Sequence, residues 1–591
     1  MVALAPQPPV PPAGTPFVLL DDARAGGAPA RLYTGPRHIL VATEASQVRA
    51  VIDAASTDTA DAAGFLSYAA GGAFEPRAAD PHPCPTPLAW FGLFDGWRTI
   101  DDVASWLPDA AGAALGPLTP AVSHDDYAAM FDAAQALITA GDLYQLNLTF
   151  RATVPVLGDA LALYARLRGA AGAGWGAIVA TGDQLLLSFS PELFVAVDGD
   201  RLTCRPMKGT ARRDPDAARD AAAADTLAAD TKQRAENLMI VDLMRNDLAR
   251  VAVAGSVDVP ALFAIERYPT VHQMTSTVTA TLAPGRDVRD VLAALFPCGS
   301  VTGAPKVRAM QAIAAIERGP ARGPYTGAIG RIDRSGDAMF NVAIRTLLID
   351  RDAREATLGI GGGIVADSRV DDEWDEAMAK AAFLDAARAS GDLIETMAFD
   401  PIEGIPLVER HLERMKGSAL LLGFAFDRHA TRNELQAATF RLREPARIRL
   451  LLARSGAIAI EVAPLPPVLT RPLRAVAARL PVARDDWRLQ HKTTDRGFWD
   501  RARRATGADE VVFVDPAGTL TEGSFTNIFV ARGDYLLTPR AGPLLPGVLR
   551  AELLATGRAI EADLTVDDLR DGFLLGNALR GLMPAVLTVA Q

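Results

Sequence analysis

The pattern that most constrains the fold is a long alternation of strand-like and helical runs, from residue 17 to about residue 390. In YAAMFDAAQALITAGD the apolar residues recur at helical spacing up to a glycine suited to a helix C-terminus, whereas QLLLSFSPELFVAV is typical of strands. A chain of 591 residues is also too long for a single core. We therefore expect an α+β architecture with more than one domain, the first occupying residues 17–390.

A second module is predicted to begin near residue 391, where two strand-like runs around a turn precede an amphipathic helix. The Pro-rich stretch APLPPVLTRP at 463–472 predicts a link between a small lobe, about 391–465, and a larger lobe, about 473–591. The Pro-rich residues 1–16 have no basic start and no long apolar run, so we expect a flexible leader rather than a signal peptide.

Charge and cysteine usage exclude several classes of protein. A formal net charge of −11 disfavours a nucleic-acid partner, since phosphate binding needs a basic face. No stretch is apolar enough to span a membrane. Cys84, Cys204 and Cys298 are scattered, without the spacing of a metal site or a disulfide framework. We expect a cytoplasmic protein that binds neither nucleic acid nor membrane.

Two glycine-rich stretches invite a nucleotide interpretation, which their spacing does not support. GSVTGAPK lacks the adjacent Gly-Lys-Ser/Thr of a phosphate-binding loop, and GIGGGIVADS does not fit GxGxxG. Both are better interpreted as turns whose backbone N–H groups approach an anionic ligand.

Acidic residues on predicted helices indicate a cation site. Glu236 lies in a helical run among apolar neighbours, and a further helix is predicted over 368–390 with Ser368 as its N-cap. Glu373 and Glu376 are three residues apart and would share one face of that helix. Three such carboxylates suit Mg²⁺ shared with an anionic substrate. The alternative is that Glu373, in the acidic run DDEWDE, is simply solvated helix charge.

Seven motifs in order, over about residues 60–390, resemble the chorismate-utilising enzymes: SPELF, RPMKGTARR, KQRAENLMIVDLMRNDL, FPCGSVTGAPK, YTGAIG, FNVAIRT and GGGIVADS. The branch of aminodeoxychorismate synthase component I is the most similar. The resemblance implies a chorismate-binding α/β sandwich in the first half of the chain.

Lysine is uncommon in this chain, because only six of its 60 Lys and Arg residues are lysines. Unlike arginine, a buried lysine can lose its proton and act as a nucleophile. The resemblance implies that Lys208 attacks C2 of the chorismate ring and expels the C4 hydroxyl, after which ammonia adds at C4 and displaces the lysine. Gln145 stands where the isochorismate and salicylate branch has a water-activating lysine, so ammonia is the expected nucleophile.

The resemblance also implies roles for other side chains. Glu236 and Glu376, with Glu373 close by, would bind the Mg²⁺ that holds the ring carboxylate. Glu192 would be a general acid and base near the C4 hydroxyl. The remaining implied substrate-binding residues are Tyr325 and Arg345, which would hold a substrate carboxylate, and Gly209, Thr210, Thr302, Gly361 and Gly362.

Two questions remain at this first predicted site. Gln273, in VHQMTS, stands where many relatives have histidine, and whether His272 replaces that histidine stays open. None of the three cysteines resembles a glutaminase nucleophile. We therefore expect ammonia to come from a separate glutamine amidotransferase subunit or from solution.

The second module resembles another family. HLERM, HKTTDR, LTEGSFTNIF, LLPGVLR and GNALRG, over about residues 391–591, are similar to the pyridoxal-phosphate enzymes of the branched-chain aminotransferase fold, in particular 4-amino-4-deoxychorismate lyase. This implies a two-lobed domain of fold type IV. Lys492 would bind pyridoxal 5′-phosphate covalently and Glu522 would pair with its pyridine nitrogen. The implied phosphate-binding residues are Arg414 and the backbone near Gly547, Val548, Asn577 and Ala578.

The two resemblances imply consecutive reactions. The first half would make 4-amino-4-deoxychorismate, and the second half would release pyruvate from it to give 4-aminobenzoate, a step towards folate. The rival interpretations are an anthranilate synthase-like component I fused to a class IV transaminase, a synthase subunit with an unrelated transaminase, and a non-catalytic scaffold. The oligomeric state, including a homodimer through the pyridoxal-phosphate domain, the identity of the amidotransferase and direct transfer of the intermediate stay open.

Overall fold

The computed structural model describes residues 7–269 and 271–588, which divide into two compact units. Residues 7–16 of the predicted leader form neither helix nor strand, and residues 1–6 lie outside the described part of the chain. The first unit comprises the described residues up to Leu107, Leu118–Val154 and Tyr164–Ala386, and the second comprises Pro108–Pro117, Pro155–Leu163 and the described residues from Ala387 onward.

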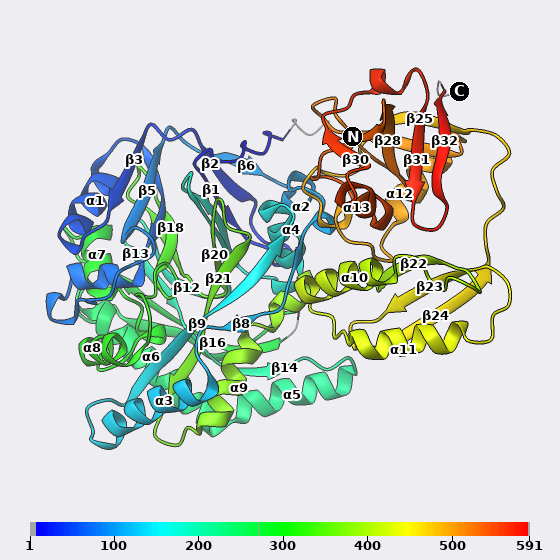
Figure 1. Cartoon of the computed structure of the whole chain (residues 1–591). Helices are drawn as coiled ribbons and strands as arrows, with labels where there is room; N and C mark the ends of the chain where they lie inside the picture. Colours follow the sequence, from blue (N-terminus) through cyan, green and yellow to red (C-terminus); the bar gives the residue numbers. More distant parts are fainter. Residues whose placement is uncertain (1–6, 270, 589–591) are drawn as a thin grey trace. The chain divides into compact units, whose positions relative to one another are not determined.

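Two large sheets of antiparallel strand pairs form the first unit (Figure 1). The first sheet has the order β17 (Gly303–Ala304), β9 (Gln145–Leu157), β21 (Glu355–Ile364), β20 (Thr346–Asp350), β11 (Gln184–Ser190), β10 (Trp175–Ala180), β1 (Phe17–Asp21), β2 (Ala30–Thr34) and β6 (Arg98–Ile100), with β8 (Thr119–Pro120) also on β9. The second has the order β14 (Met207–Arg212), β16 (Val271–Thr281), β13 (Arg201–Arg205), β12 (Leu193–Asp198), β19 (Ala338–Val342), β18 (Ala328–Ile332), β4 (Asp61–Leu66), β5 (Ala89–Phe94) and β3 (His38–Ala42), with β15 (Asp258–Arg267) on β16.

Strand periodicity explains how these sheets stack. Phe65 of β4 and Trp90 of β5 join a core cluster that includes Val18 of β1 and Val179 of β10, so one face of the second sheet packs on the first sheet. The alternate side chains, such as Phe91, join another cluster together with three helices. These helices are α1 (Ala45–Thr57), α6 (Thr231–Ala249) and α7 (Val288–Leu295). The expected α/β sandwich is confirmed.

The remaining α-helices of this unit are α2 (Val103–Trp106), α3 (His124–Thr139), α5 (Ala217–Ala229), α8 (Lys306–Ile316), α9 (Val370–Lys380) and α4 (Ala160–Ala171), whose first four residues belong to the second unit. The predicted helix over 368–390 is wrong in extent, because α9 ends at Lys380 and a 3-10 helix, Ala382–Ala387, follows. Ser368 is not its N-cap, since Arg369 occupies that position. The Ser368 hydroxyl instead donates to Glu373 Oε1 at 2.6 Å, which ties it to a side chain of the helix rather than to its backbone.

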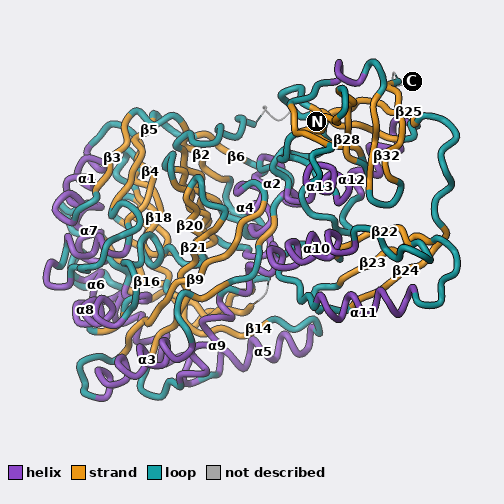
Figure 2. The backbone as a smooth tube through the Cα atoms, in the orientation of Figure 1, coloured by secondary structure: helices purple, strands orange, loops and turns teal. Residues whose placement is uncertain are grey.

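The second unit contains two sheets. Three strands, β22 (Leu393–Phe399), β23 (Ala446–Leu452) and β24 (Ile458–Pro464), pair in that order and pack with α10 (Val408–Leu422) and α11 (Arg428–Thr439). The larger sheet has the order β27 (Leu520–Gly523), β26 (Glu510–Val514), β25 (Leu473–Arg479), β32 (Gly581–Leu587), β31 (Phe573–Asn577), β28 (Asn527–Arg532), β29 (Tyr535–Pro539) and β30 (Ala559–Ala562), and it packs with α12 (Gly497–Thr506) and α13 (Val548–Ala555). Residues 465–472 join the two sheets as a long loop (Figure 2).

Short stretches from the first half of the sequence are built into this second unit. The Trp487 indole Nε1 donates to the Ala111 carbonyl at 3.0 Å, and the buried guanidinium of Arg488 lies 3.6 Å from Asp109. β7 (Ala114–Leu115) pairs with the last residues of β9. The C-terminal unit is therefore completed by residues 108–117 and 155–163. Along the described chain, no helix combines the length and apolarity needed to cross a membrane.

Candidate functional sites

Lys208 lies at a β-bulge. Met207 pairs with Thr275 and Thr210 pairs with Gln273, so β14 has one residue more than β16 between these two pairs. Gly209 within the bulge has a φ of 96°, a conformation that favours glycine. A bulge bends the strand and re-aims the side chain that it carries. The half-buried Lys208 amine is thereby presented from an irregular point of the strand.

Glu192 and Lys208 interact inside the first unit. Glu192 precedes β12, is 3% exposed, and accepts a hydrogen bond from the Ser300 hydroxyl at 2.7 Å. Burial raises the pKa of Glu192 to about 7, against the opposing effects of Ser300 and of the Lys208 charge. Burial lowers the pKa of Lys208, the Lys380 charge lowers it further, and Glu192 opposes this. A carboxyl group with this pKa can both donate and accept a proton near neutral pH.

The glycines of β21 place several predicted residues side by side. A Cβ atom on Gly363 would lie 2.4 Å from Gln145 Nε2 and 3.2 Å from Lys208 Nζ, so the absence of a side chain there is what leaves room for both. On the neighbouring residue, Gly362, a Cβ would lie 3.0 Å from Glu373 Oε2. The backbone of Gly362 and Gly363 therefore lies close to the predicted nucleophile and to a predicted metal ligand, which leaves no room for a side chain on either residue.

The three predicted metal ligands influence one another. Burial raises the pKa of Glu236 and of Glu373, and repulsion from Glu376 adds to both shifts. Glu376 itself has a lowered pKa because the Lys380 ammonium lies 2.9 Å from its carboxylate. Lys380 also donates to the Gly361 carbonyl at 2.7 Å. Lys380 thus acts on Glu373 and Glu376, whereas the cations that act on Glu236 are Lys208 and Lys232.

The oxygen atoms of these carboxylates are suitable ligands for a hard cation, but the side chains are not arranged as a metal site. Among residues 7–269 and 271–588, no three His, Cys, Asp or Glu side chains are close enough together to hold a metal ion. Carboxylate oxygens are nevertheless the ligands that Mg²⁺ prefers. Mutual repulsion between Glu236, Glu373 and Glu376 is also the condition that a bound cation would relieve. The oxygen donors are of the kind that magnesium prefers, whereas their spacing in this structure does not form a metal site.

Three of the other predicted substrate-binding residues make no described contact with Lys208. Thr302 is buried and its hydroxyl donates to the Cys298 carbonyl at 2.8 Å. The Tyr325 ring packs against Gly359, where a Cβ would lie 2.1 Å from the ring. Arg345 follows β19 with a φ of 49°, and burial lowers its pKa. Among the described contacts, none joins Thr302, Tyr325 or Arg345 to Lys208.

His272 does not take the place of Gln273. Its Nε2 lies 2.9 Å from Asp220 Oδ1 on α5, whereas the Gln273 amide contacts Gly209 and Thr210. Side chains of adjacent strand residues point to opposite faces, which explains the separation.

Two residues of this first site were not predicted, although the sequence carried a signal for each. Ser300 lies within the FPCGSVTGAPK motif, and Lys380 follows Glu376 by four residues, the spacing of an ion pair on one helix face.

Lys492 is half-buried and Glu522 is buried in the second unit. Burial, and then the Arg414 charge, lower the pKa of Lys492 to about 7, while Glu395 opposes this. Burial raises the pKa of Glu522, on β27, to about 8, with Arg496 opposing. Glu522 Oε1 has no hydrogen-bond partner within the described part of the chain. An unpaired buried carboxylate oxygen is a costly group that a ligand N–H would satisfy, which fits a protonated pyridine nitrogen.

Arg414 is held at the start of α13. Its Nε and Nη2 donate to the two oxygens of buried Glu395, at 2.8 and 2.6 Å, and its Nη1 donates to the Pro546 carbonyl at 3.1 Å. His411 Nδ1 also lies 2.6 Å from Glu395. Burial alone would raise the pKa of Glu395, but Arg414 and His411 hold it at about 2. Arg414 thus presents one guanidinium edge to a helix N-terminus, a combination that suits a phosphate.

The other predicted phosphate contacts lie at two turns. Gly547 is the N-cap of α13 and Val548 its first residue. Asn577 ends β31, and its Oδ1 accepts from the backbone N–H groups of Leu579 and Arg580, at 3.1 and 2.9 Å. Ala578 lies inside this turn, between β31 and β32. The sequence had not indicated Glu395, His411 or Arg496, because their importance depends on partners distant in sequence.

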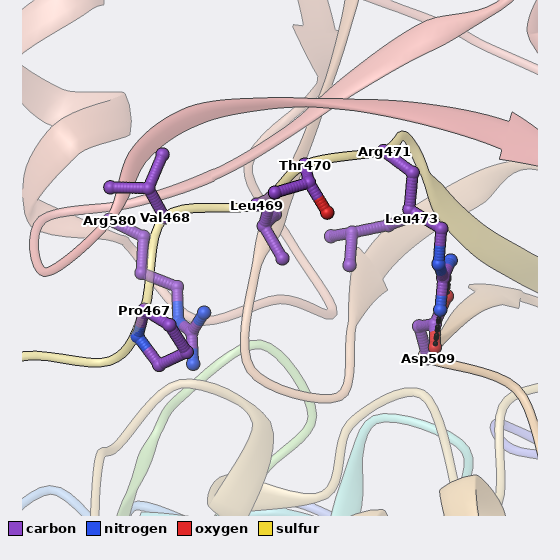
Figure 3. A pocket seen from close by; sticks show the side chains of 8 residues that line it. All are labelled: Pro467, Val468, Leu469, Thr470, Arg471, Leu473, Asp509 and Arg580. Atoms are coloured by element: carbon purple, nitrogen blue, oxygen red, sulfur yellow. Dashed lines mark hydrogen bonds and ion pairs between the residues drawn. The ribbon is translucent and has the colours of Figure 1, made fainter.

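A shallow surface pocket of about 200 Å³ lies elsewhere in the second unit, along the loop that joins its sheets (Figure 3). It is lined by Pro467, Val468, Leu469, Thr470, Arg471, Leu473, Asp509 and Arg580. The bidentate pair of Arg471 and Asp509 closes one end, with N···O distances of 2.6 and 3.0 Å. None of these lining residues is a predicted cofactor ligand, although Arg580 contacts the predicted ligand Asn577.

Comparison with known proteins supports the family resemblance of each half of the chain. Residues 16–386 match the family described as chorismate binding enzyme, and residues 392–587 match the family Amino-transferase class IV. The chain is 42% identical over 305 residues to an aminodeoxychorismate synthase of Streptomyces pristinaespiralis. The matched region covers 51% of this chain and 42% of that protein. It is 42% identical over 259 residues to aminodeoxychorismate synthase component 1 of Escherichia coli K12, covering 44% and 56%. The chain thus spans about half the length of these curated relatives.

The fold has a solved counterpart. The crystal structure of anthranilate synthase component I from Streptococcus pneumoniae superposes with a TM-score of 0.53 at 24% identity, covering 65% of this chain and 94% of that one. At this identity the likeness shows the fold alone. Because the first family match extends over more than half of the sequence, the chain belongs to the chorismate binding enzymes, and it carries a C-terminal domain of the class IV aminotransferase type.

Proposed function

We propose that this chain converts chorismate and ammonia to 4-amino-4-deoxychorismate, and then releases pyruvate from that product to give 4-aminobenzoate. The observation that carries the proposal is the position of the Lys208 amine beside Gly363 and Gln145 in a chorismate-binding fold, with the buried Glu192 carboxyl near enough for the two charges to affect each other's pKa. Relatives with 42% identity to the first half are named aminodeoxychorismate synthases, which supports this substrate and product.

In the first reaction Lys208 acts as the nucleophile. Its neutral amine attacks C2 of the ring, both conjugated ring double bonds shift, and the C4–O bond breaks as Glu192 gives its proton to the leaving hydroxyl, which departs as water. Ammonia then adds at C4, both double bonds shift back, and the C2–N bond to Lys208 breaks. The Glu192 carboxylate takes up the proton that ammonia loses. Magnesium held by Glu236 and Glu376, with Glu373, would neutralise the ring carboxylate.

In the second reaction the residues around Lys492 bind and move protons. Pyridoxal phosphate, when bound, supplies an electron sink. Arg414 and the N-terminus of α13 would hold its phosphate, and Glu522 would hold its pyridine nitrogen. Lys492, with a pKa of about 7, can take the proton from C4 of the substrate while the C3–O bond to the pyruvate unit breaks. Loss of that proton and of pyruvate makes the ring aromatic.

The ammonia has a separate source in this proposal. Cys204 and Cys298 are buried in a hydrophobic core cluster and Cys84 is partly buried against it, surroundings that do not activate a thiol towards an external substrate such as glutamine. A glutamine amidotransferase subunit would therefore supply ammonia, consistent with the designation of one relative as component 1. Free ammonium at high pH would replace that subunit in vitro. We expect the assembly to work in the cytoplasm, where free thiols are stable.

The purified chain should be mixed with chorismate, Mg²⁺, ammonium and pyridoxal phosphate, and the products separated by chromatography. The expected products are 4-aminobenzoate and pyruvate. Lys492→Ala should instead accumulate 4-amino-4-deoxychorismate, and borohydride should fix the cofactor to the wild-type peptide that contains Lys492. Formation of anthranilate in place of 4-aminobenzoate would overturn the proposal for the first half. Transamination without 4-aminobenzoate would overturn it for the second.

A further inference from the structure

The bulge that carries Lys208 leaves two backbone carbonyls outside the regular β-ladder, and buried amide side chains bind both. Gln273 Nε2 donates to the Gly209 carbonyl at 2.6 Å, and Gln273 Oε1 accepts from the Thr210 hydroxyl at 2.9 Å. Asn237 Nδ2 donates to the Lys208 carbonyl at 3.4 Å. The irregular segment is therefore bound by side chains where the strand pairing is interrupted.

Both amides are themselves fixed. Gln273 is 6% exposed and Asn237 is 1% exposed. Asn237 Oδ1 accepts from the Ser276 hydroxyl at 2.6 Å, so its amide orientation is set by one donor and one acceptor. Asn237 also directly follows Glu236 on α6. Buried amides that are bound through both their nitrogen and their oxygen favour one arrangement of the backbone that they bind.

We propose that Gln273 is a positioning residue for the amine of Lys208: by binding both Gly209 and Thr210 it fixes the bulge that aims this amine. This inference rests on the proposed role of Lys208 as the nucleophile. It also gives Gln273 a role different from proton transfer, since a neutral amide neither gains nor loses a proton at ordinary pH.

Only a side chain with a donor and an acceptor at its tip can make both contacts. A carboxylate at position 273 would still accept from Thr210, but its second oxygen would face the Gly209 carbonyl and repel it. A methionine would fill a similar volume and make neither contact. His272 cannot compensate, because its ring is paired with Asp220 on the other face of the strand.

The test compares Gln273→Met and Gln273→Glu with a matched control, Gln311→Met. Gln311, on α8, also donates from its amide to a backbone carbonyl, that of Arg77 at 3.0 Å, at the exposed surface of the same unit. Two quantities are measured: kcat and KM for formation of 4-amino-4-deoxychorismate with ammonium, and the pH dependence of Lys208 modification by a small amine-reactive reagent, read by peptide mass spectrometry.

Both Gln273 variants are expected to lower kcat on the order of 100-fold with KM for chorismate unchanged, because a misplacement of about 1 Å has that effect on a reacting group. The Lys208 labelling profile should move to higher pH as the freed amine gains solvent. Gln311→Met should match the wild type in both measurements. Should a Gln273 variant fail to fold, Gln273→Asn keeps the amide but shortens its reach, and it should lower kcat at an unchanged melting temperature.

Wild-type kcat and a wild-type labelling profile in the Gln273 variants would overturn the inference. So would a loss that appears entirely in KM, since that describes substrate binding and not the aim of the amine. The labelling measurement reports the position of the amine whatever reaction it performs. Normal turnover by Lys208→Ala would therefore disprove the role of Lys208 as the nucleophile. An unshifted Lys208 labelling profile in the Gln273 variants would disprove the positioning role of Gln273.

Discussion

Covalent capture of pyridoxal phosphate by the cofactor-free protein should titrate with a midpoint near pH 7. Burial and the neighbouring Arg414 bring the pKa of Lys492 from an ordinary value of 10.5 to about 7. A lysine needs a neutral amine to react with the cofactor aldehyde. At pH 7 about half of the Lys492 amines would be neutral, whereas an unperturbed lysine would be neutral in about one molecule in 3000.

The assay is stopped-flow mixing of cofactor-free protein with pyridoxal phosphate from pH 6 to pH 9, following the visible absorbance of the lysine-bound cofactor. The capture rate should rise about tenfold between pH 6 and pH 8 and then level off. A small amine-reactive reagent, used in parallel, compares Lys492 with Lys416, whose side chain is exposed on α10. A capture rate that keeps rising through pH 9 without levelling would refute the argument that burial holds Lys492 neutral.

The same lowered pKa has a consequence for stability. The unfolded chain binds a proton at Lys492 up to about pH 10.5, whereas the folded cofactor-free chain releases it near pH 7. The unfolded state therefore holds more protons across this window, so the Lys492 contribution makes the free energy of unfolding increase from pH 7 towards pH 10.5. Lys492→Met should remove this part of the pH dependence and stabilise the cofactor-free protein below that window, as measured by denaturant unfolding.

Three further perturbations have separable outcomes. Lys208→Ala should abolish amination at C4 and leave the melting temperature unchanged, with amination at C2 as the only residual reaction detected by chromatography; a normal yield of 4-amino-4-deoxychorismate would contradict the covalent role. Glu236→Gln or Glu376→Gln should raise the Mg²⁺ concentration needed for chorismate consumption, and lyase activity on supplied intermediate should stay constant unless the effect is misfolding. Trp487→Phe, which loses the hydrogen bond to the Ala111 carbonyl, should destabilise the second unit by about 1 kcal/mol in denaturant unfolding. An unchanged stability would mean that residues 108–117 are not part of that unit in solution.

Local sequence patterns were sufficient to predict many of the helices and strands of the fold. The helical spacing of YAAMFDAAQALITAGD predicted α3, and the alternating runs predicted the strands of the sandwich. Where the prediction of 368–390 failed, Ser368 was engaged by Glu373 instead of capping the helix. A capping pattern records which hydrogen bonds a residue can make, and the neighbouring groups determine which of them forms.

The sequence by itself also indicated which residues we propose to carry the chemistry, since the motifs around Lys208, Glu192, Lys492 and Glu522 are local. Tertiary structure alone decided what those side chains can do. The bulge at Gly209 depends on Gln273, 64 residues away, and the orientation of Arg414 depends on Glu395 in another element. The lowered pKa of Lys492 comes mainly from burial. Burial and long-range pairing depend on which distant segments pack together, so no local pattern contains them.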